Sequence, residues 1–159
     1  MEINFDKKEK VDVLISALEE RYKSIHTIRE RIQNICLWAL GIFFAAGGWI
    51  IQSRLILFLP AKIIFIGAVI IIFFSIKNYL NDLKQGFKSQ QCVAVRLEKA
   101  LGFFTPKVFD DSTESIYPKG WENTGTENGE GKFFQTTFNL LNIGFWFLIA
   151  SILLKGCFF

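Results

Sequence analysis

Long stretches without a charged residue constrain the fold of this chain more than any other feature. The 22 residues at 32–53 contain no Asp, Glu, Lys or Arg, and neither do the 22 residues at 133–154. A third charge-free stretch of 14 residues, 63–76, lies between Lys62 and Lys77. A helix needs about 20 apolar residues to cross the hydrocarbon core of a bilayer. The first and last stretches meet this length, and the middle one meets it when its flanking residues join the helix and both lysines extend to the interfaces.

These stretches predict an all-α membrane protein with three transmembrane helices, at about 33–52, 61–80 and 133–154. A soluble fold is excluded because the remaining residues are too few to bury three helices that are apolar on every side. The expected organisation is a cytoplasmic helix at 1–34, a two-span hairpin at 35–80, a cytoplasmic helix at 81–103, a cytoplasmic loop at 104–132, and a third span with a short outer tail at 133–159.

The distribution of Lys and Arg predicts the orientation of the spans. Seven of these residues precede the first span and eight lie in 77–132, whereas the hairpin between the first two spans has two and the C-terminal tail has one. Segments rich in Lys and Arg stay in the cytoplasm. We therefore expect the N-terminus and the long central segment to be cytoplasmic and the C-terminus to lie outside.

The composition provides little for catalysis. The net charge of +3 is too small to indicate nucleic-acid binding, and the chain has one His and three widely spaced Cys. We expect no catalytic residues, no metal site and no cofactor. One alternative stays open, because Arg21 and His26 have the R-x-x-x-x-H spacing of HEPN ribonucleases, and a membrane-tethered ribonuclease would use them.

Two spans are expected to continue as amphipathic helices in the cytoplasm. Apolar residues recur at helical spacing on both sides of the hairpin, with one polar interruption on each side, Arg21 and Gln90. No Gly or Pro precedes Gly41, so one helix should run from the cytoplasm into the first span, whereas Gly102 should end the second helix. Since the two helices leave adjacent spans, we expect them to pair as an antiparallel stalk.

The third span begins with an unusual polar face. Gln135, Asn139 and Asn142 lie at i, i+4 and i+7, on one side of a helix. Lipid cannot satisfy amide side chains, so this face must meet another helix or water. Two roles remain open, hydrogen bonding between helices and the lining of a pore. In a pore, Phe147 and the apolar remainder of the span would form a hydrophobic gate.

The first span carries a row of small residues, Gly41, Ala45 and Gly48, which permits close packing of another helix. Three spans alone form a thin bundle. We therefore expect a homo-oligomer with cyclic symmetry embedded in the lipid bilayer, and take a tetramer as the working assumption.

Candidate ligand-binding residues lie on the second cytoplasmic helix and in the loop that follows it. Lys84, Lys88, Arg96 and Lys99 could bind an anion or lipid headgroups, but the acidic residues Asp82 and Glu98 nearby favour a solvated helix face as the explanation. Trp121 is an isolated aromatic residue in a Gly-rich polar loop. It is expected to dock on the stalk or to stack on a ligand.

The layout of the N-terminal half resembles a known family. A charged helix, ALEERYKSIHTIRERIQN at 17–34, leads directly into two closely spaced spans and a helical extension, over roughly residues 10–100. This resembles the SLATT-type membrane effectors of bacterial anti-phage nucleotide-signalling systems. The third span points to a related channel effector, such as the membrane component of Hailong-type systems. The resemblance implies a pore in the bacterial inner membrane, a periplasmic C-terminus, a nucleotide or oligonucleotide signal or a nucleotidyltransferase as partner, and depolarisation of the infected cell.

Together these features predict an oligomeric ion channel that is gated from the cytoplasm. The alternative is a non-conducting anchor or scaffold that binds a partner protein through its helical stalk.

Overall fold

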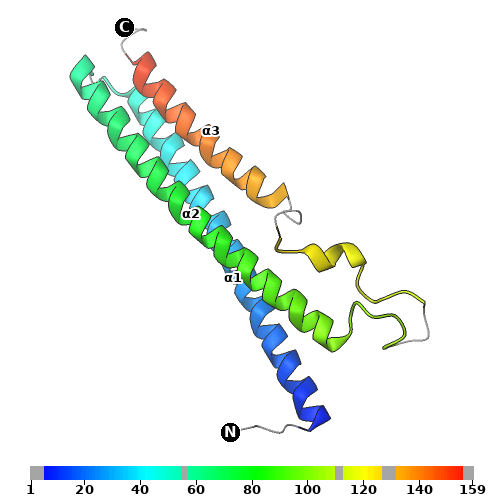
Figure 1. Ribbon diagram of the computed structural model, residues 1–159. Helices are drawn as coiled ribbons and strands as arrows, with labels where there is room; N and C mark the ends of the chain where they lie inside the picture. Colours follow the sequence, from blue (N-terminus) through cyan, green and yellow to red (C-terminus); the bar gives the residue numbers. More distant parts are fainter. Residues whose placement is uncertain (1–5, 55–56, 110–112, 127–131, 156–159) are drawn as a thin grey trace. The chain divides into compact units, whose positions relative to one another are not determined.

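The chain is almost entirely helical. The computed structural model describes residues 6–54, 57–109, 113–126 and 132–155. Three long helices follow one another, α1 (Lys7–Gln52), α2 (Leu59–Leu101) and α3 (Lys132–Leu154), with a short 3-10 turn, η1 (Lys119–Asn123), before α3 (Figure 1). No strand occurs in these described ranges. The predicted all-α class is confirmed, and all three long helices are long and apolar enough to cross a membrane.

The predicted continuity of the first helix is confirmed. α1 is one helix of 46 residues, and it includes both the charged N-terminal segment and the first span. Asp6 precedes the helix, and its backbone N–H donates to the Glu9 carboxylate at 2.9 Å. This contact is one half of a capping box, which satisfies a donor that the first turn leaves unpaired.

The second helix is also continuous. α2 extends over 43 residues through Gly86 and stops where Gly102 was expected to stop it. Gly102 adopts a left-handed φ of 88°, and the N–H of Phe103 donates to the carbonyl of Glu98 at 3.1 Å. This Schellman arrangement satisfies carbonyls at a helix end and requires a residue that tolerates positive φ.

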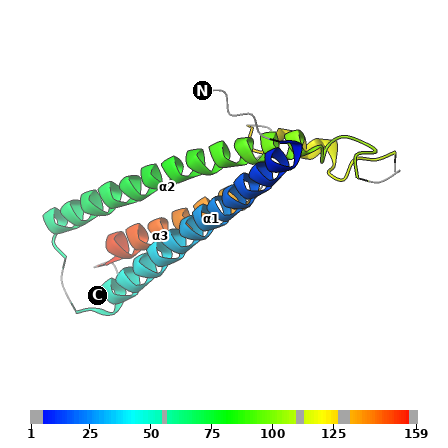
Figure 2. The same cartoon turned by 90° about the horizontal axis from the view of Figure 1, so that it is seen from below.

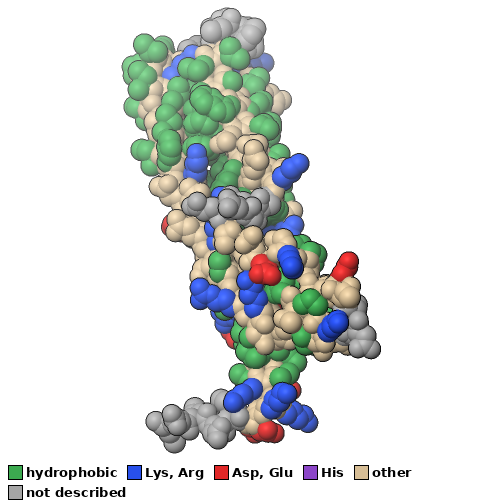
Figure 3. All heavy atoms as spheres, turned by 45° about the vertical axis from the view of Figure 1, so that its right-hand side comes forward, with side chains coloured by type: hydrophobic (Ala, Val, Ile, Leu, Met, Phe, Trp, Pro, Cys, Tyr) green, Lys and Arg blue, Asp and Glu red, His purple; other side chains and the backbone are tan. Residues whose placement is uncertain are grey.

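The chain forms two compact units. Unit 1 comprises Met1–Glu30 and Lys84–Glu130, and unit 2 comprises Arg31–Leu83 and Gly131–Phe159. The three predicted spans all fall in unit 2, whose visible surface in Figure 3 is dominated by hydrophobic side chains, whereas most of the charged side chains in that view belong to unit 1. The division of the sequence by charge is thus also a division into packed units.

In unit 2, α3 packs against both other helices. The ring of Phe145 on α3 stacks on Phe73 of α2, with centroids 4.1 Å apart. On the α1 side, the ring centroid of Phe147 lies 4.6 Å from that of Phe44. α3 runs alongside α1 in both ribbon views (Figures 1 and 2). The α1 residues buried here recur at helical spacing, namely Ile32, Cys36, Ala39 and Phe43.

In unit 1, the expected antiparallel pairing of α1 with α2 is confirmed. Leu18 of α1 and Phe87 and Ala94 of α2 are buried, as their positions in the two apolar stripes predict. The chain after α2 adds Phe104 to the same core. The segment predicted as a simple loop is therefore part of the packed unit.

Candidate functional site

Two of the three amides of α3 lie on the side of the helix that the rest of unit 2 leaves uncovered, and the third lies at the edge of that side. Gln135 and Asn139 are exposed, and Asn142 is half-buried. The opposite side of the helix packs against α1 and α2 and consists of Phe134, Thr137, Leu141, Gly144, Phe145, Leu148, Ile149, Ser151 and Ile152. The amide face predicted from the spacing therefore exists as a surface of the single chain.

No neighbouring helix of the same chain satisfies these amides. In the described part of the chain, the side-chain hydrogen bonds of α3 come from Thr137 and Ser151, and none comes from the amides. Both hydroxyls donate at 2.8 Å to the carbonyl four residues earlier in α3 itself. The polar atoms on the packed side are thus satisfied locally, whereas the amides still lack partners.

Phe147, predicted to lie in a pore with the amides, occupies a different position on α3. It is half-buried, and its ring packs on Phe44 and over Gly47 of α1. The exposed residues that continue the amide face by spacing are Ile143 and Trp146, which are 55% and 65% exposed. The role of Phe147 as a pore residue stays a prediction.

The small residues that contact α3 are not the ones that the sequence singled out. Gly41, Ala45 and Gly48 are exposed, and a Cβ added at Gly41 or Gly48 would meet nothing within 4 Å. Instead, a Cβ at Gly47 would lie 2.6 Å from the Phe147 ring, and one at Gly144 would lie 2.9 Å from Leu40. The predicted small-residue face is therefore open in the single chain, and Gly47 and Gly144 let α1 and α3 approach closely.

Two lysines join the helix ends on the side of unit 2 where α1 and α3 end. Lys155 is 8% exposed, and its ammonium donates to the carbonyls of Ile51, at 3.2 Å, and Ser53 at the end of α1. Lys62 of α2 donates to the carbonyl of Leu153 at 3.2 Å, near the end of α3. The C-terminal carbonyls of a helix lack intrahelical donors and carry partial negative charge, so a cation from the neighbouring helix stabilises them.

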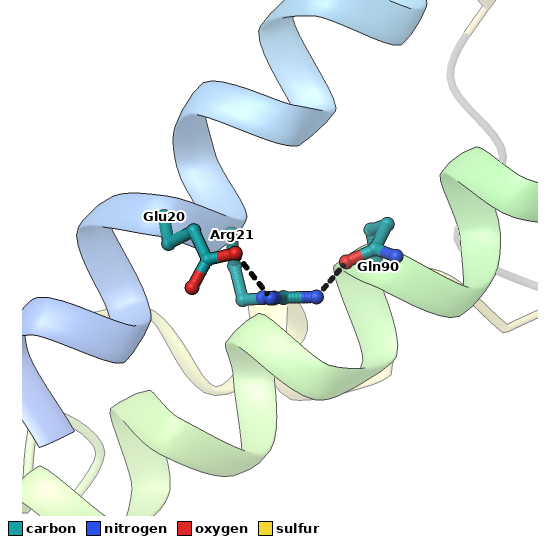
Figure 4. Close-up of polar contacts among 3 residues, drawn as sticks. All are labelled: Glu20, Arg21 and Gln90. Atoms are coloured by element: carbon teal, nitrogen blue, oxygen red, sulfur yellow. Dashed lines mark hydrogen bonds and ion pairs between the residues drawn. The ribbon is translucent and has the colours of Figure 1, made fainter.

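The two polar interruptions in the apolar stripes of unit 1 bind each other. Arg21 donates from Nη1 to Oε1 of Gln90 at 2.8 Å, and its Nη2 lies 3.0 Å from the carboxylate of Glu20 (Figure 4). His26, the other residue of the R-x-x-x-x-H pattern, is exposed, with Nδ1 3.7 Å from the Glu30 carboxylate one turn later. Arg21 thus joins the two stalk helices.

A second polar contact joins the same helices. The Tyr22 hydroxyl donates to Glu98 at 2.5 Å, and Glu98 is only 7% exposed. Burial of the hydroxyl, followed by its hydrogen bond to this carboxylate, raises the pKa of Tyr22 well above its ordinary value. The neutral phenol is the form that donates this bond.

The raised pKa of Tyr22 predicts that stability decreases at high pH. The folded protein holds the phenol proton more tightly than the unfolded chain does, so the stabilisation is complete below the ordinary tyrosine pKa of about 10 and decreases as the pH rises above it. We expect the Tm of the wild type to fall more steeply above about pH 10 than that of Tyr22→Phe, which has no phenol proton. Thermal unfolding in detergent across this pH range measures the difference, and parallel curves would contradict it.

The structure places all five predicted ligand-binding residues in unit 1, and they differ in exposure and in their contacts. Lys84 and Lys88 are half-buried and Arg96 is exposed. Lys99 already has a partner, because its ammonium lies 2.9 Å from the Glu122 carboxylate. Trp121 is 56% exposed, and its ring lies against Tyr117 with centroids 5.4 Å apart.

Aromatic side chains of the segment after α2 pack on one another, a feature that was not predicted from the sequence. Tyr117 is 5.1 Å from Phe103 and 5.7 Å from Phe104 between ring centroids, and Phe109 stacks on Phe103 at 5.3 Å. The sequence signal that could have predicted this packing is the presence of four aromatic residues and a Trp within residues 103–121, an otherwise largely polar stretch. Such rings stabilise a segment because they bury a large apolar area and pack in stacked or edge-to-face pairs.

Comparisons add no family to these observations. Within 6–54, 57–109, 113–126 and 132–155, no three His, Cys, Asp or Glu side chains gather where they could hold a metal ion. Searches against protein-family models, curated proteins and solved structures return no match to this chain.

Proposed function

We propose that this protein is an oligomeric ion channel of the membrane, gated from the cytoplasm, in which copies of α3 surround the conducting path. The observation that carries the proposal is the unpartnered amide face of α3 formed by Gln135, Asn139 and Asn142. An amide exposed to hydrocarbon costs kilocalories of free energy. The face must therefore meet water or other polar groups, which the described part of a single copy does not provide.

The depth of these residues in the span strengthens the argument. Asn142 is ten residues beyond Lys132, the first residue of α3. At about 1.5 Å per residue this is about 15 Å, half the thickness of a hydrocarbon core of about 30 Å. Asn142 is too deep for its short side chain to reach the interface. Beyond it, the exposed Ile143 and Trp146 would form a narrow hydrophobic section that closes by dewetting.

The charge distribution supports regulation from the cytoplasm. Under the positive-inside rule unit 1 lies in the cytoplasm and the end of α3 lies outside. The resemblance to SLATT-type and Hailong-type effectors adds the biological setting, in which a nucleotide signal controls a pore that depolarises the bacterial inner membrane. The C-terminus would then be periplasmic.

Thiol labelling in liposomes tests the proposal. In a cysteine-free background, Asn142→Cys should react with a membrane-impermeant thiol reagent, since water reaches it through the pore. Ile71→Cys is the matched control, because Ile71 is exposed near the middle of the second span and should face lipid. Planar-bilayer recording of the wild type should show discrete openings. Protection of both positions together with silent bilayers would instead support the non-conducting scaffold.

A further inference from the structure

A segment of unit 1 lies along α2 in the reverse direction. We call this segment, residues 117–126, the strap. Its first residue is anchored at the end of α2, because the Tyr117 N–H donates to the carbonyl of Phe103 at 3.0 Å and its ring packs on Phe103 and Phe104. The strap then forms η1, with the Trp121 N–H bonded to the carbonyl of Pro118.

An ion pair holds the middle of the strap. The Glu122 carboxylate lies 2.9 Å from the Lys99 ammonium, and the two side chains are 35% and 46% exposed. A partly exposed ion pair contributes little free energy and is weakened further by salt. This contact holds the strap without making it permanent.

The last contact is made by backbone. Gly125 has a φ of 88°, and a Cβ built on it would lie 3.0 Å from both the Sγ and the backbone N of Cys92. Only a residue without a side chain fits here without strain. Between Lys99 and Cys92 the strap has moved back along α2 by seven residues, or about 10 Å.

The strap also leads directly to α3. Only residues 127–131 separate Thr126 from Lys132, where α3 begins. At no more than about 3.6 Å per residue, this tether spans at most about 22 Å. An attached strap therefore limits how far the first turn of α3 can move, and a detached strap lengthens the tether.

We propose that the strap is an autoinhibitory contact, which holds the channel closed while it is attached to α2 and permits opening when it detaches. The inference rests on the proposed function, because it assigns the control of the pore to a specific contact. The Lys99–Glu122 pair is the part that a change in the cytoplasm can weaken, whereas the Tyr117 ring cluster anchors the start of the strap. The mechanism requires no movement of α2.

Charge reversal in planar bilayers tests the role of the ion pair. Glu122→Lys places two ammonium groups together and should raise the open probability severalfold above that of the wild type. The double variant Lys99→Glu with Glu122→Lys restores an ion pair of opposite polarity and should return the open probability to the wild-type level. An open probability that stays unchanged in Glu122→Lys would overturn the inference.

A reversible disulfide tests the attachment itself. Gly125→Cys would place its Cβ 3.0 Å from the native Cys92 sulfur, within reach of a disulfide. In the Glu122→Lys background, oxidation should form this bond, detected by mass spectrometry, and abolish the openings, which a reductant should restore. Gly125→Ser in that background carries the same backbone strain without a thiol, so the oxidant should not change its openings.

The outcomes separate the two proposals. A disulfide that forms while the openings continue unchanged overturns the strap but not the channel. Failure of the disulfide to form contradicts the attachment when Gly125→Ser, which carries the same strain, leaves the open probability of Glu122→Lys unchanged. Silence of the wild type, Glu122→Lys and the reduced cysteine variant alike overturns the channel and the strap with it.

Discussion

Replacing both Asn139 and Asn142 by leucine will abolish conductance while leaving the oligomer assembled. Leucine has the same branched shape, although it is larger, and no hydrogen-bonding group, so the proposed path would lose its polar lining and water would leave it. Asn139 is exposed and Asn142 is half-buried, and neither belongs to the buried side of α3, so the packing of α3 on α1 and α2 should be retained. Planar-bilayer recording measures conductance, and sizing in detergent or native nanodiscs measures assembly.

The control for this experiment is Thr136→Leu, an exposed change at the same end of α3 but off the amide face. It should conduct like the wild type. If the double leucine variant instead falls apart into single chains, the amides join helices of different copies and do not line a pore. Interhelical amide hydrogen bonds of roughly 0.6–2 kcal/mol each would explain that outcome.

Gly47→Leu will separate α1 from α3 and produce the largest loss of stability of any single change considered for unit 2. The first added carbon would already lie 2.6 Å from the Phe147 ring and 2.9 Å from the Ser151 hydroxyl, and three further carbons would follow it. Overpacking of a close contact costs about 1–3 kcal/mol, and more where backbones must move apart. We expect a Tm in detergent many degrees lower than that of the wild type, or no folded protein at all.

Gly48→Leu is the matched control, with the same change one residue further along α1. A Cβ there meets nothing within 4 Å, so the single chain should keep its Tm. Since Gly48 belongs to the open face with Gly41 and Ala45, this variant also reports on assembly: a smaller oligomer with an unchanged chain fold would identify the face as a contact between copies. Equal loss of stability in the two variants would contradict the packing of α3 on α1.

Much of the fold could be predicted because its signals are local. The absence of charge over 32–53 and 133–154 marks the long apolar helices, and the lack of Gly or Pro before Gly41 predicts an unbroken α1. Gly102 ends α2 because it adopts the left-handed conformation that other residues avoid. Each of these inferences uses residues that are neighbours along the chain, so no knowledge of the packing is needed.

The candidate site could be predicted only in part. Helical spacing alone places Gln135, Asn139 and Asn142 on one face, but spacing does not say which helix that face meets. Arg21 and Gln90 were visible only as interruptions of two stripes, yet they bind each other across 69 residues of sequence. Gly47 faces α3, whereas Gly41 and Gly48 do not. Which glycine faces α3 depends on how α1 is rotated about its axis, and the side chains of both helices together determine that rotation.

By itself, the sequence determined which segments are helices, which of them are apolar enough for a membrane, and which face of α3 is polar. The tertiary structure alone decided the partners: the lysines that bind the helix ends of unit 2, the glycines at the α1–α3 contact, and the strap on α2. The physical reason is the distance along the chain over which each interaction acts. Hydrophobicity and backbone preference act within a few turns of a helix, whereas an ammonium such as that of Lys155 finds the carbonyls of Ile51 and Ser53 only after folding has brought distant segments together.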